Sequence, residues 1–257
     1  MKSLAIAANT FREARRHRVF YVIFFFALIV ILNSVLFTNL AVASQDRILR
    51  DVGTAAIDFF GVLLAIFLGV GMVSREVDRR TVYTVVTKPI RRADFILGKF
   101  FGLNAVLGVT LGVMFLCFVA VLAVTPAFEP PNYATLTWHL VLRLVQLALL
   151  VSFAIFMSTF AATPMATFAT IGIFLIGHLS SDLKYWGQKS ENPVVDALST
   201  GIYYLFPNLG RFSISEQIAY NMPVDTARAL TTILYGVLYT AVFLVAAVMV
   251  FNKRDFK

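Results

Sequence analysis

The sequence predicts an all-α integral membrane protein with six transmembrane helices, and two observations carry this prediction. First, 59% of the 257 residues are hydrophobic and only 14% are charged, whereas an ordinary soluble domain has about 25% charged residues. Second, six segments come close to the roughly 20 apolar residues that a helix needs to cross the hydrocarbon core. The surface therefore needs lipid around it, and residues 1–257 are expected to form a single transmembrane domain.

The predicted spans lie at about 19–40, 55–73, 100–124, 140–162, 163–179 and 229–251. Basic residues precede the first apolar run, as in a signal peptide. That run is much longer than the apolar region of about 7–15 residues that a signal contains, so we expect it to be retained as the first span. The fifth segment is short and has Pro164 at its start, where a missing N–H is tolerated. The fourth and fifth spans should therefore form a tight hairpin.

Two segments outside the spans also have helical character. Residues 5–16 are amphipathic, with apolar residues on one side and Arg12, Arg15 and Arg16 available to headgroups, which is typical of an interfacial helix. Residues 180–228 form a predicted external segment in which apolar residues recur at roughly helical spacing. Pro193, Pro207 and Pro223 should divide this segment into short helices.

The basic residues predict the orientation of the spans. Fifteen of the 22 Lys and Arg residues lie in three places: before the first span, between residues 74 and 99, and after the last span. Such residues concentrate on the cytoplasmic side, so both termini are expected in the cytoplasm of a multi-pass protein of a bacterial-type inner membrane. The net charge of +8 then has a membrane explanation, with membrane lipid as its partner. No basic run is interleaved with aromatic residues, which disfavours nucleic-acid binding.

Polar residues near the outer ends of the spans are candidates for function by default. Asp58 and Arg143 could pair with each other, but snorkelling of each side chain to the outer surface is the favoured interpretation. His139 and His178 fit an interfacial belt with neighbouring aromatic residues, and they lack the spacing of a metal site. Cys117 has no partner for a disulfide. No metal or other cofactor is therefore expected in this chain.

Other polar and small residues lie deeper in the predicted spans. Asn33, Asn104 and Gln146 could form interhelical hydrogen bonds or line a substrate path, and the sequence leaves both alternatives open. Gly98 and Gly102, like Gly108 and Gly112, have the four-residue spacing that permits close helix approach. General packing between helices explains this spacing better than a specific dimer interface.

The segment 74–99 is the strongest candidate for a functional surface. It combines a stretch with helical periodicity, from Glu76 to about Thr87, with Pro89, which ends the helix because the residue before proline avoids the α region. Its bland interpretation is a basic loop that obeys the insertion rule. Its functional interpretation is a short helix that docks into a cytoplasmic partner. The candidate docking residues are Glu76, Arg79, Arg80, Thr81, Tyr83, Lys88, Pro89, Arg91 and Arg92.

The order of these residues resembles the coupling-helix loop of ABC-2-type permeases: Glu76, then Arg80-Thr81, an apolar stretch, Lys88-Pro89, a basic pair, and Gly98-Lys99. Residues 9–14, 204–209 and 251–256 are similar to the branch that includes copper-processing and gliding-type permeases. The likeness covers the whole chain through an ordered set of short motifs.

The resemblance implies a permease, working as an exporter with a second permease copy or a paralogue. It also implies two copies of a separate cytoplasmic ATPase, which bind ATP and Mg. This chain is not expected to be an enzyme, because Gly98-Lys99 is followed by Phe100 and lacks the upstream glycine of a P-loop.

Two alternatives remain. One is a subunit that transmits force or supports assembly, with an extracytoplasmic partner at 180–228. The other is an intramembrane enzyme, for which the spans offer no cluster of catalytic residues.

Overall fold

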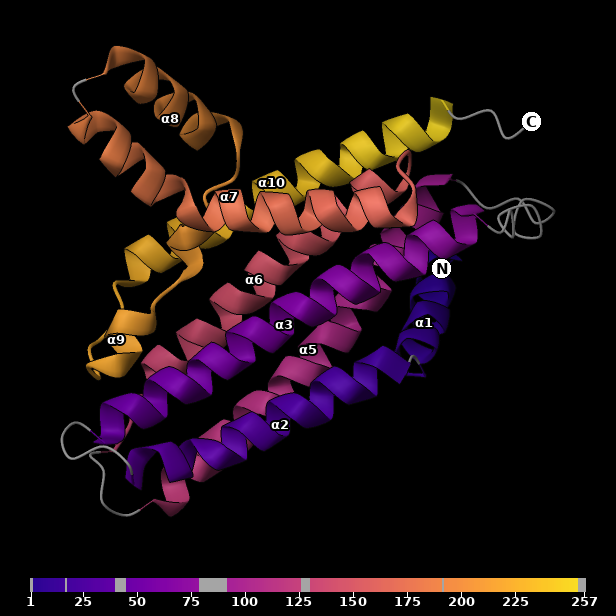
Figure 1. The fold of residues 1–257 in the computed structure, drawn as a ribbon. Helices are drawn as coiled ribbons and strands as arrows, with labels where there is room; N and C mark the ends of the chain where they lie inside the picture. Colours follow the sequence, from indigo (N-terminus) through magenta and orange to yellow (C-terminus); the bar gives the residue numbers. More distant parts are fainter. Residues whose placement is uncertain are drawn as a thin grey trace.

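The computed structural model describes residues 2–16, 18–39, 45–78, 92–125, 130–190 and 192–253, and every regular element within them is helical. The long helices run side by side in one bundle (Figure 1). They are α2 (Arg18–Asn39), α3 (Gln45–Asp78), α5 (Arg92–Val124), α6 (Tyr133–Ser158), α7 (Thr163–Lys189) and α10 (Thr226–Lys253). The shorter elements are α1 (Lys2–Arg15), α8 (Pro193–Leu205), the 3₁₀ helix η1 (Leu209–Phe212) and α9 (Ser215–Ala219).

Five of the described helices, α3, α5, α6, α7 and α10, are long and apolar enough to cross a membrane. Helices α1 and α2 bring the number to six when they are counted together, although they meet at a bend of 65°. This bend separates the predicted N-terminal interfacial helix from the first span. The all-helical membrane architecture predicted from the sequence is therefore confirmed.

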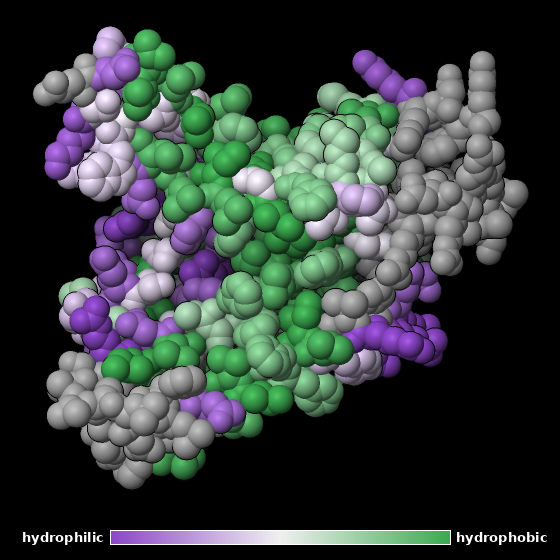
Figure 2. Space-filling view, in the orientation of Figure 1, coloured by the Kyte–Doolittle hydropathy of each residue, from purple (hydrophilic) through white to green (hydrophobic). Residues whose placement is uncertain are grey.

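Helices α3 and α6 form the centre of the bundle. Helix α3 packs against α2, α5, α6, α7 and α9, and α6 packs against α3, α5, α7 and α10. The outward faces of the surrounding helices are apolar, with side chains such as Phe26, Leu116 and Leu234 more than half exposed. Figure 2 shows this apolar surface over the middle of the bundle. Apolar side chains in contact with the outside are the expected surface of a protein surrounded by lipid.

Polar side chains and prolines set the helix boundaries on the side of α8 and α9. The side chain of Asn132 accepts a hydrogen bond from Thr135 N at 3.2 Å and caps α6, and Asn192 caps α8 in the same way through Val194 N at 3.0 Å. Asn221 adopts a positive φ of 56°, and its Oδ1 accepts from Asn132 N at 2.7 Å. The segment before α10 is thereby tied to the start of α6.

The predicted tight hairpin is present, because α6 ends at Ser158 and α7 begins at Thr163 with Pro164 in its first turn. Helix α7 is longer than predicted and continues to Lys189. Its last turns pack against α8, and the two stand out from the bundle (Figure 1). The predicted breaks at Pro193, Pro207 and Pro223 are confirmed, since α8 starts at the first, and the other two lie between helices.

Helix α1 packs mainly against the first half of α5. Gly98 and Gly102 make this possible, because a Cβ at Gly98 would lie 2.6 Å from Cβ of Ile6, and one at Gly102 would lie 2.6 Å from Cβ of Thr10. Lys99 Nζ lies 3.5 Å from Oε2 of Glu13 on α1. This glycine pair therefore serves packing within the chain, as the sequence favoured.

Candidate functional site

A buried polar cluster joins α3 to α6 inside the bundle. His139, Arg143 and Gln146 lie on one face of α6 at i, i+4 and i+7, and Asp58 faces them from α3. Arg143 donates from Nη2 to Oδ2 of Asp58, and from Nη1 to Oε1 of Gln146 at 2.6 Å. His139 Nε2 lies 3.2 Å from Oδ1 of Asp58. The cluster brings one carboxylate, one guanidinium, one imidazole and one amide together.

The snorkelling predicted for Arg143 is wrong, because its side chain points inward to Asp58 and is 5% exposed. The interfacial position predicted for His139 is also wrong, since this residue is 1% exposed. The physical reason is that a charge away from water is costly unless it is paired. An inward ion pair stabilises both charges inside the bundle. The alternative of an Asp58–Arg143 pair is the one that the structure contains.

The cluster keeps unused hydrogen-bonding capacity. Oδ1 of Asp58, both ring nitrogens of His139, Nε of Arg143 and Nε2 of Gln146 are buried without a hydrogen-bond partner. His139 Nε2 is within ion-pair distance of Asp58, but its direction does not give a hydrogen bond. This contact is therefore close but is not a hydrogen bond. Buried polar atoms without partners are uncommon in native proteins, and here they lie next to a cavity.

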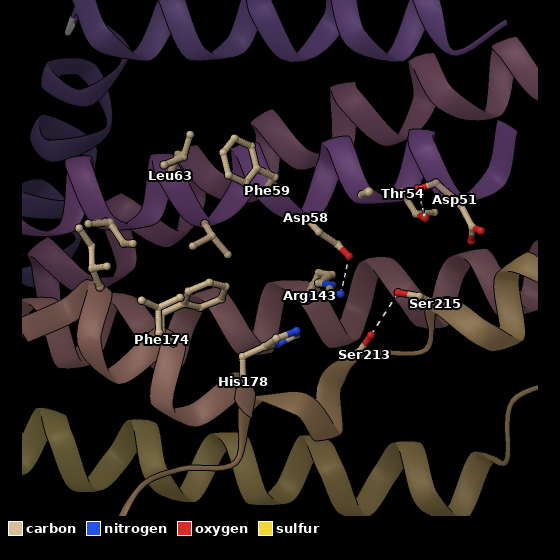
Figure 3. A pocket seen from close by; sticks show the side chains of 15 residues that line it. Asp51, Thr54, Asp58, Phe59, Leu63, Arg143, Phe174, His178, Ser213 and Ser215 are labelled. Carbon is tan, nitrogen blue, oxygen red and sulfur yellow. Dashed lines mark hydrogen bonds and ion pairs between the residues drawn. The ribbon is translucent and has the colours of Figure 1, made fainter. Parts of the chain in front are cut away.

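A cavity of about 620 Å³ lies beside this cluster, between α3, α7 and the segment 213–215. Figure 3 shows Asp58 and Arg143 pointing toward each other at its wall. Its polar lining residues are Asp51, Thr54, Asp58, Arg143, His178, Ser213 and Ser215. Its apolar lining residues are Ala55, Phe59, Val62, Leu63, Ile66, Ile171, Phe174 and Leu175. A volume of this size suits a small molecule.

Polar and apolar linings occupy different parts of this cavity. Along α3 the polar residues Asp51, Thr54 and Asp58 come first, and Val62 to Ile66 follow deeper in the bundle. On the surface, polar side chains gather in a recess between the α7–α8 pair and α9 (Figure 2). The cavity therefore has a polar outer part and an apolar inner part.

His178 is the one member of the predicted aromatic and histidine belt that lines the cavity. It is exposed, stacks on Phe174 with ring centroids 5.9 Å apart, and points toward the Asp58–Arg143 pair (Figure 3). In the part of the chain that the structure describes, no group of three or more His, Cys, Asp or Glu residues could hold a metal ion. Asn33 and Asn104 instead donate to carbonyl groups of their own helices, Ile29 and Phe100, at 2.8 Å.

Two of the predicted docking residues, Glu76 and Arg92, belong to the described part of the structure. Arg79, Arg80, Thr81, Tyr83, Lys88, Pro89 and Arg91 lie outside the described residues. Glu76 belongs to the last turn of α3, and Arg92 is the first residue of α5. Arg92 donates from Nη1 to the carbonyl oxygens of Phe251 and Asn252 on α10, each at 2.8 Å. Its role in docking to a partner stays a prediction.

The Asp58–Arg143–His139–Gln146 cluster is the feature that the sequence did not identify as a unit. Its α6 members were recognisable in principle, because polar residues at i, i+4 and i+7 of a predicted span share one face. Their partner on α3 lies 85 residues away along the chain from Arg143. Periodicity within one helix does not indicate which face of another helix it meets.

The bundle of long apolar helices and its apolar outer surface define a multi-pass α-helical membrane protein. The sequence profile of the ABC-2 family transporter proteins matches residues 4–256, so the chain belongs to this family. Its members are non-catalytic membrane subunits of ABC transporters, which work with an ABC ATPase. The comparison with curated proteins gave no match.

Proposed function

We propose that this chain is the permease subunit of an ATP-driven exporter in a bacterial-type inner membrane, with both termini cytoplasmic. A separate ATPase, present in two copies, binds ATP and Mg, and the permease works as a dimer with a second copy or a paralogue. Membership of the ABC-2 family supports this proposal, and the short motifs at 9–14, 204–209 and 251–256 favour the branch of copper-processing and gliding-type permeases.

The observation that carries the coupling mechanism is the continuity of α3. This helix contains 34 residues, which corresponds to about 51 Å at a rise of about 1.5 Å per residue. Glu76 lies in its last turn, at the edge of the coupling segment 74–99, and Asp58 lies on the same helix at the cavity wall. A displacement imposed at Glu76 would therefore reach the cavity through one stiff element.

Further contacts at the same end would distribute such a displacement. The end of α3, the start of α5, the end of α10 and helix α1 lie together at one end of the bundle (Figure 1). Arg92 joins α5 to α10, and Lys99 joins α5 to α1. The polar part of the cavity lies toward the opposite end, near α9. This arrangement favours release on the side away from the ATPase, which is export.

The test is to purify the permease with the ATPase that accompanies it and to measure ATP turnover in proteoliposomes. Glu76→Ala and the double variant Arg79→Glu/Arg80→Glu should insert normally but lose the bound ATPase or its permease-dependent turnover. Charge reversal at Lys189, an exposed residue at the C-terminal end of α7, is the matched control. It should leave the bound ATPase and its permease-dependent turnover unchanged. Wild-type coupling in the two loop variants would contradict the assignment.

A force-transmitting or assembly subunit is the second candidate function, and one observation favours it. The α7–α8 pair stands out from the bundle (Figure 1), and α8 leaves Val194, Leu198 and Leu205 more than 60% exposed. An exposed apolar patch of this kind is typical of an interaction surface. This candidate predicts that ATP turnover requires an extracytoplasmic partner and is lost when these three residues are changed to serine. Turnover that is unchanged in the serine variant favours the exporter.

A further inference from the structure

The cavity beside the buried cluster has the shape of an amphiphile site. Its apolar part follows α3 from Asp58 to Ile66, which are eight residues apart in one helix. This corresponds to about 12 Å at a rise of about 1.5 Å per residue. Ile171, Phe174 and Leu175 form the facing wall on α7. A single apolar chain fits between these two walls, whereas a compact polar solute would leave them exposed to water.

The polar part of the cavity presents mainly hydrogen-bond acceptors. Oδ1 of Asp58 has no hydrogen-bond partner, and Asp51 is half exposed with only an i,i+4 contact of 3.8 Å to Arg47. Thr54 uses its hydroxyl hydrogen on Arg50 O at 2.7 Å, which leaves its oxygen as an acceptor. Ser213 and Ser215 share one hydrogen bond of 3.1 Å. Donors at this end are fewer, namely the hydroxyl hydrogen that the serine pair leaves unused and the ring N–H of His178.

The positive charge of Arg143 in the cavity wall is already paired with Asp58. Arg143 directs Nη2 to Asp58 and Nη1 to Gln146, and its Nε is buried without a hydrogen-bond partner. Asp58 and Arg143 neutralise each other, so the carboxylate of Asp51 leaves the lining with an excess of negative charge. An anionic headgroup would meet two carboxylates and a guanidinium whose charge is already paired with Asp58. A cationic headgroup meets the same carboxylates as partners.

We propose that this cavity binds a single-chain amphiphile with a cationic, hydrogen-bond-donating head. The head lies at Asp58 and Asp51, and the chain lies between α3 and α7 toward the centre of the bundle. The assignment of this ligand as cargo rests on the proposed exporter function. Binding of the ligand does not rest on that function, because every residue that lines the cavity belongs to this chain.

The test uses the full-length permease alone in phosphatidylcholine nanodiscs and a dodecylamine probe that carries a photoreactive diazirine near the end of its chain. Labelled peptides are identified by mass spectrometry. We expect labels in the apolar stretches 59–66 of α3 and 171–175 of α7. An excess of dodecylamine should reduce labelling at least tenfold, whereas dodecyl sulfate and the uncharged dodecyl glucoside at the same concentration should not.

Two kinds of variant test separately how the cavity binds the head of the probe and how it binds the chain. Leu63→Trp and Ile171→Trp fill the cavity and should abolish labelling while the other helices keep their background level. Asp58→Asn/Arg143→Gln removes both members of the ion pair, so no unpaired buried charge remains. It should abolish the advantage of dodecylamine over dodecyl glucoside in competition without removing the cavity. Asp51→Asn should reduce that advantage and leave the fold intact.

Three results would overturn the proposal. Labels spread over the lipid-facing surface, and insensitive to the two tryptophan variants, would show partitioning without a site. Stronger competition by dodecyl sulfate would assign an anionic head. Disulfide formation between two copies of Leu175→Cys in a Cys117→Ser background, accompanied by loss of labelling, would show that a second copy fills the cavity. The ATPase is absent from all these measurements. If labelling fails, the coupling proposal is not affected, and if the coupling test fails, the binding proposal is not affected.

Discussion

The guanidinium of Arg92, at the first residue of α5, donates to the carbonyl oxygens of Phe251 and Asn252 near the end of α10, each at 2.8 Å. These residues are 159 and 160 positions apart in the sequence. The carbonyl groups at the end of a helix lack intrahelical partners and carry partial negative charge. Arg92 therefore supplies both donors and positive charge to α10 from the edge of the segment 74–99.

Arg92→Gln should loosen the end of α10. Hydrogen bonds to a charged group contribute about 1.5–3 kcal/mol, and about 1.4 kcal/mol corresponds to a tenfold change in an equilibrium. We expect the backbone amides in the last two turns of α10 to exchange with solvent about tenfold faster, as measured by hydrogen exchange and mass spectrometry. Lys253→Gln, which removes an exposed charge in the same turn, is the control and should change little.

Arg143→Leu should strongly destabilise the bundle, because it leaves Asp58 as a carboxylate without its partner in the interior. Breaking a buried pair costs about 3–5 kcal/mol, whereas replacing both members by apolar residues is often neutral. The double variant Asp58→Leu/Arg143→Leu should therefore recover most of the loss. The stability of the single and the double variant is measured by denaturant titration in detergent, with circular dichroism as the signal. A double variant that is less stable than the single one would contradict the pairing argument.

Gly102→Leu should detach α1 from α5. A Cβ at this position would lie 2.7 Å from the carbonyl oxygen of Ala7, which belongs to the backbone and cannot turn aside. The matched control is Gly112→Leu on the same helix, because nothing lies within 4 Å of a Cβ there. Limited proteolysis should cleave α1 faster in the first variant alone. Equal protection in both would show that the α1–α5 contact does not need the glycine.

Tyr203 on α8, outside the candidate spans, should titrate below the ordinary tyrosine range. A hydrogen bond from Arg211 at 3.3 Å lowers the pKa of Tyr203, while burial opposes this shift. Because the folded pKa is depressed, the resulting stability is present above the unfolded pKa, which is about 10. It is lost as the pH falls through the lower folded pKa.

Tyrosinate absorbance, taken as the difference between wild type and Tyr203→Phe, measures this titration directly. Arg211→Gln should move the transition to higher pH, because it removes the largest cause of the shift. The surface position of Tyr203 means that the stability effect is reduced by solvent and salt. A transition that does not move in Arg211→Gln would rule out this contact as the cause.

The sequence predicted the long apolar helices because lipid imposes a simple requirement on each helix separately. Helices α3, α5 and α6 nevertheless begin 10, 8 and 7 residues before the predicted spans at 55, 100 and 140. About 20 apolar residues and the prolines at 164, 193, 207 and 223 are local signals, and they placed the helices and their breaks. The end of α7 was missed because Ser180 to Lys189 is polar enough to resemble a loop, although α8 packs against it in the structure. Tertiary contact there overrides the local signal.

The candidate site was predictable only in its parts. The sequence favoured snorkelling because the predicted span starts at 140, only three residues before Arg143. In the structure α6 starts at Tyr133, ten residues before Arg143. What decides between snorkelling and burial is the side of α6 that faces α3, and this follows from the packing of the whole bundle. The segment 74–99 shows the opposite situation. Its motifs are readable in sequence, yet most of its docking residues lie outside the described part of the structure.

The contact between α1 and α5 also sets an order of events during synthesis. Glu13 and Lys99 are separated by 86 residues, so at about 5–20 residues per second the N-terminal helix is made roughly 4–17 seconds before its partner exists. During this interval α1 has no α5 to pack against. It can settle between its neighbours only after α5 has been made and inserted. Helix α1 therefore reaches its packed position only some time after its own synthesis.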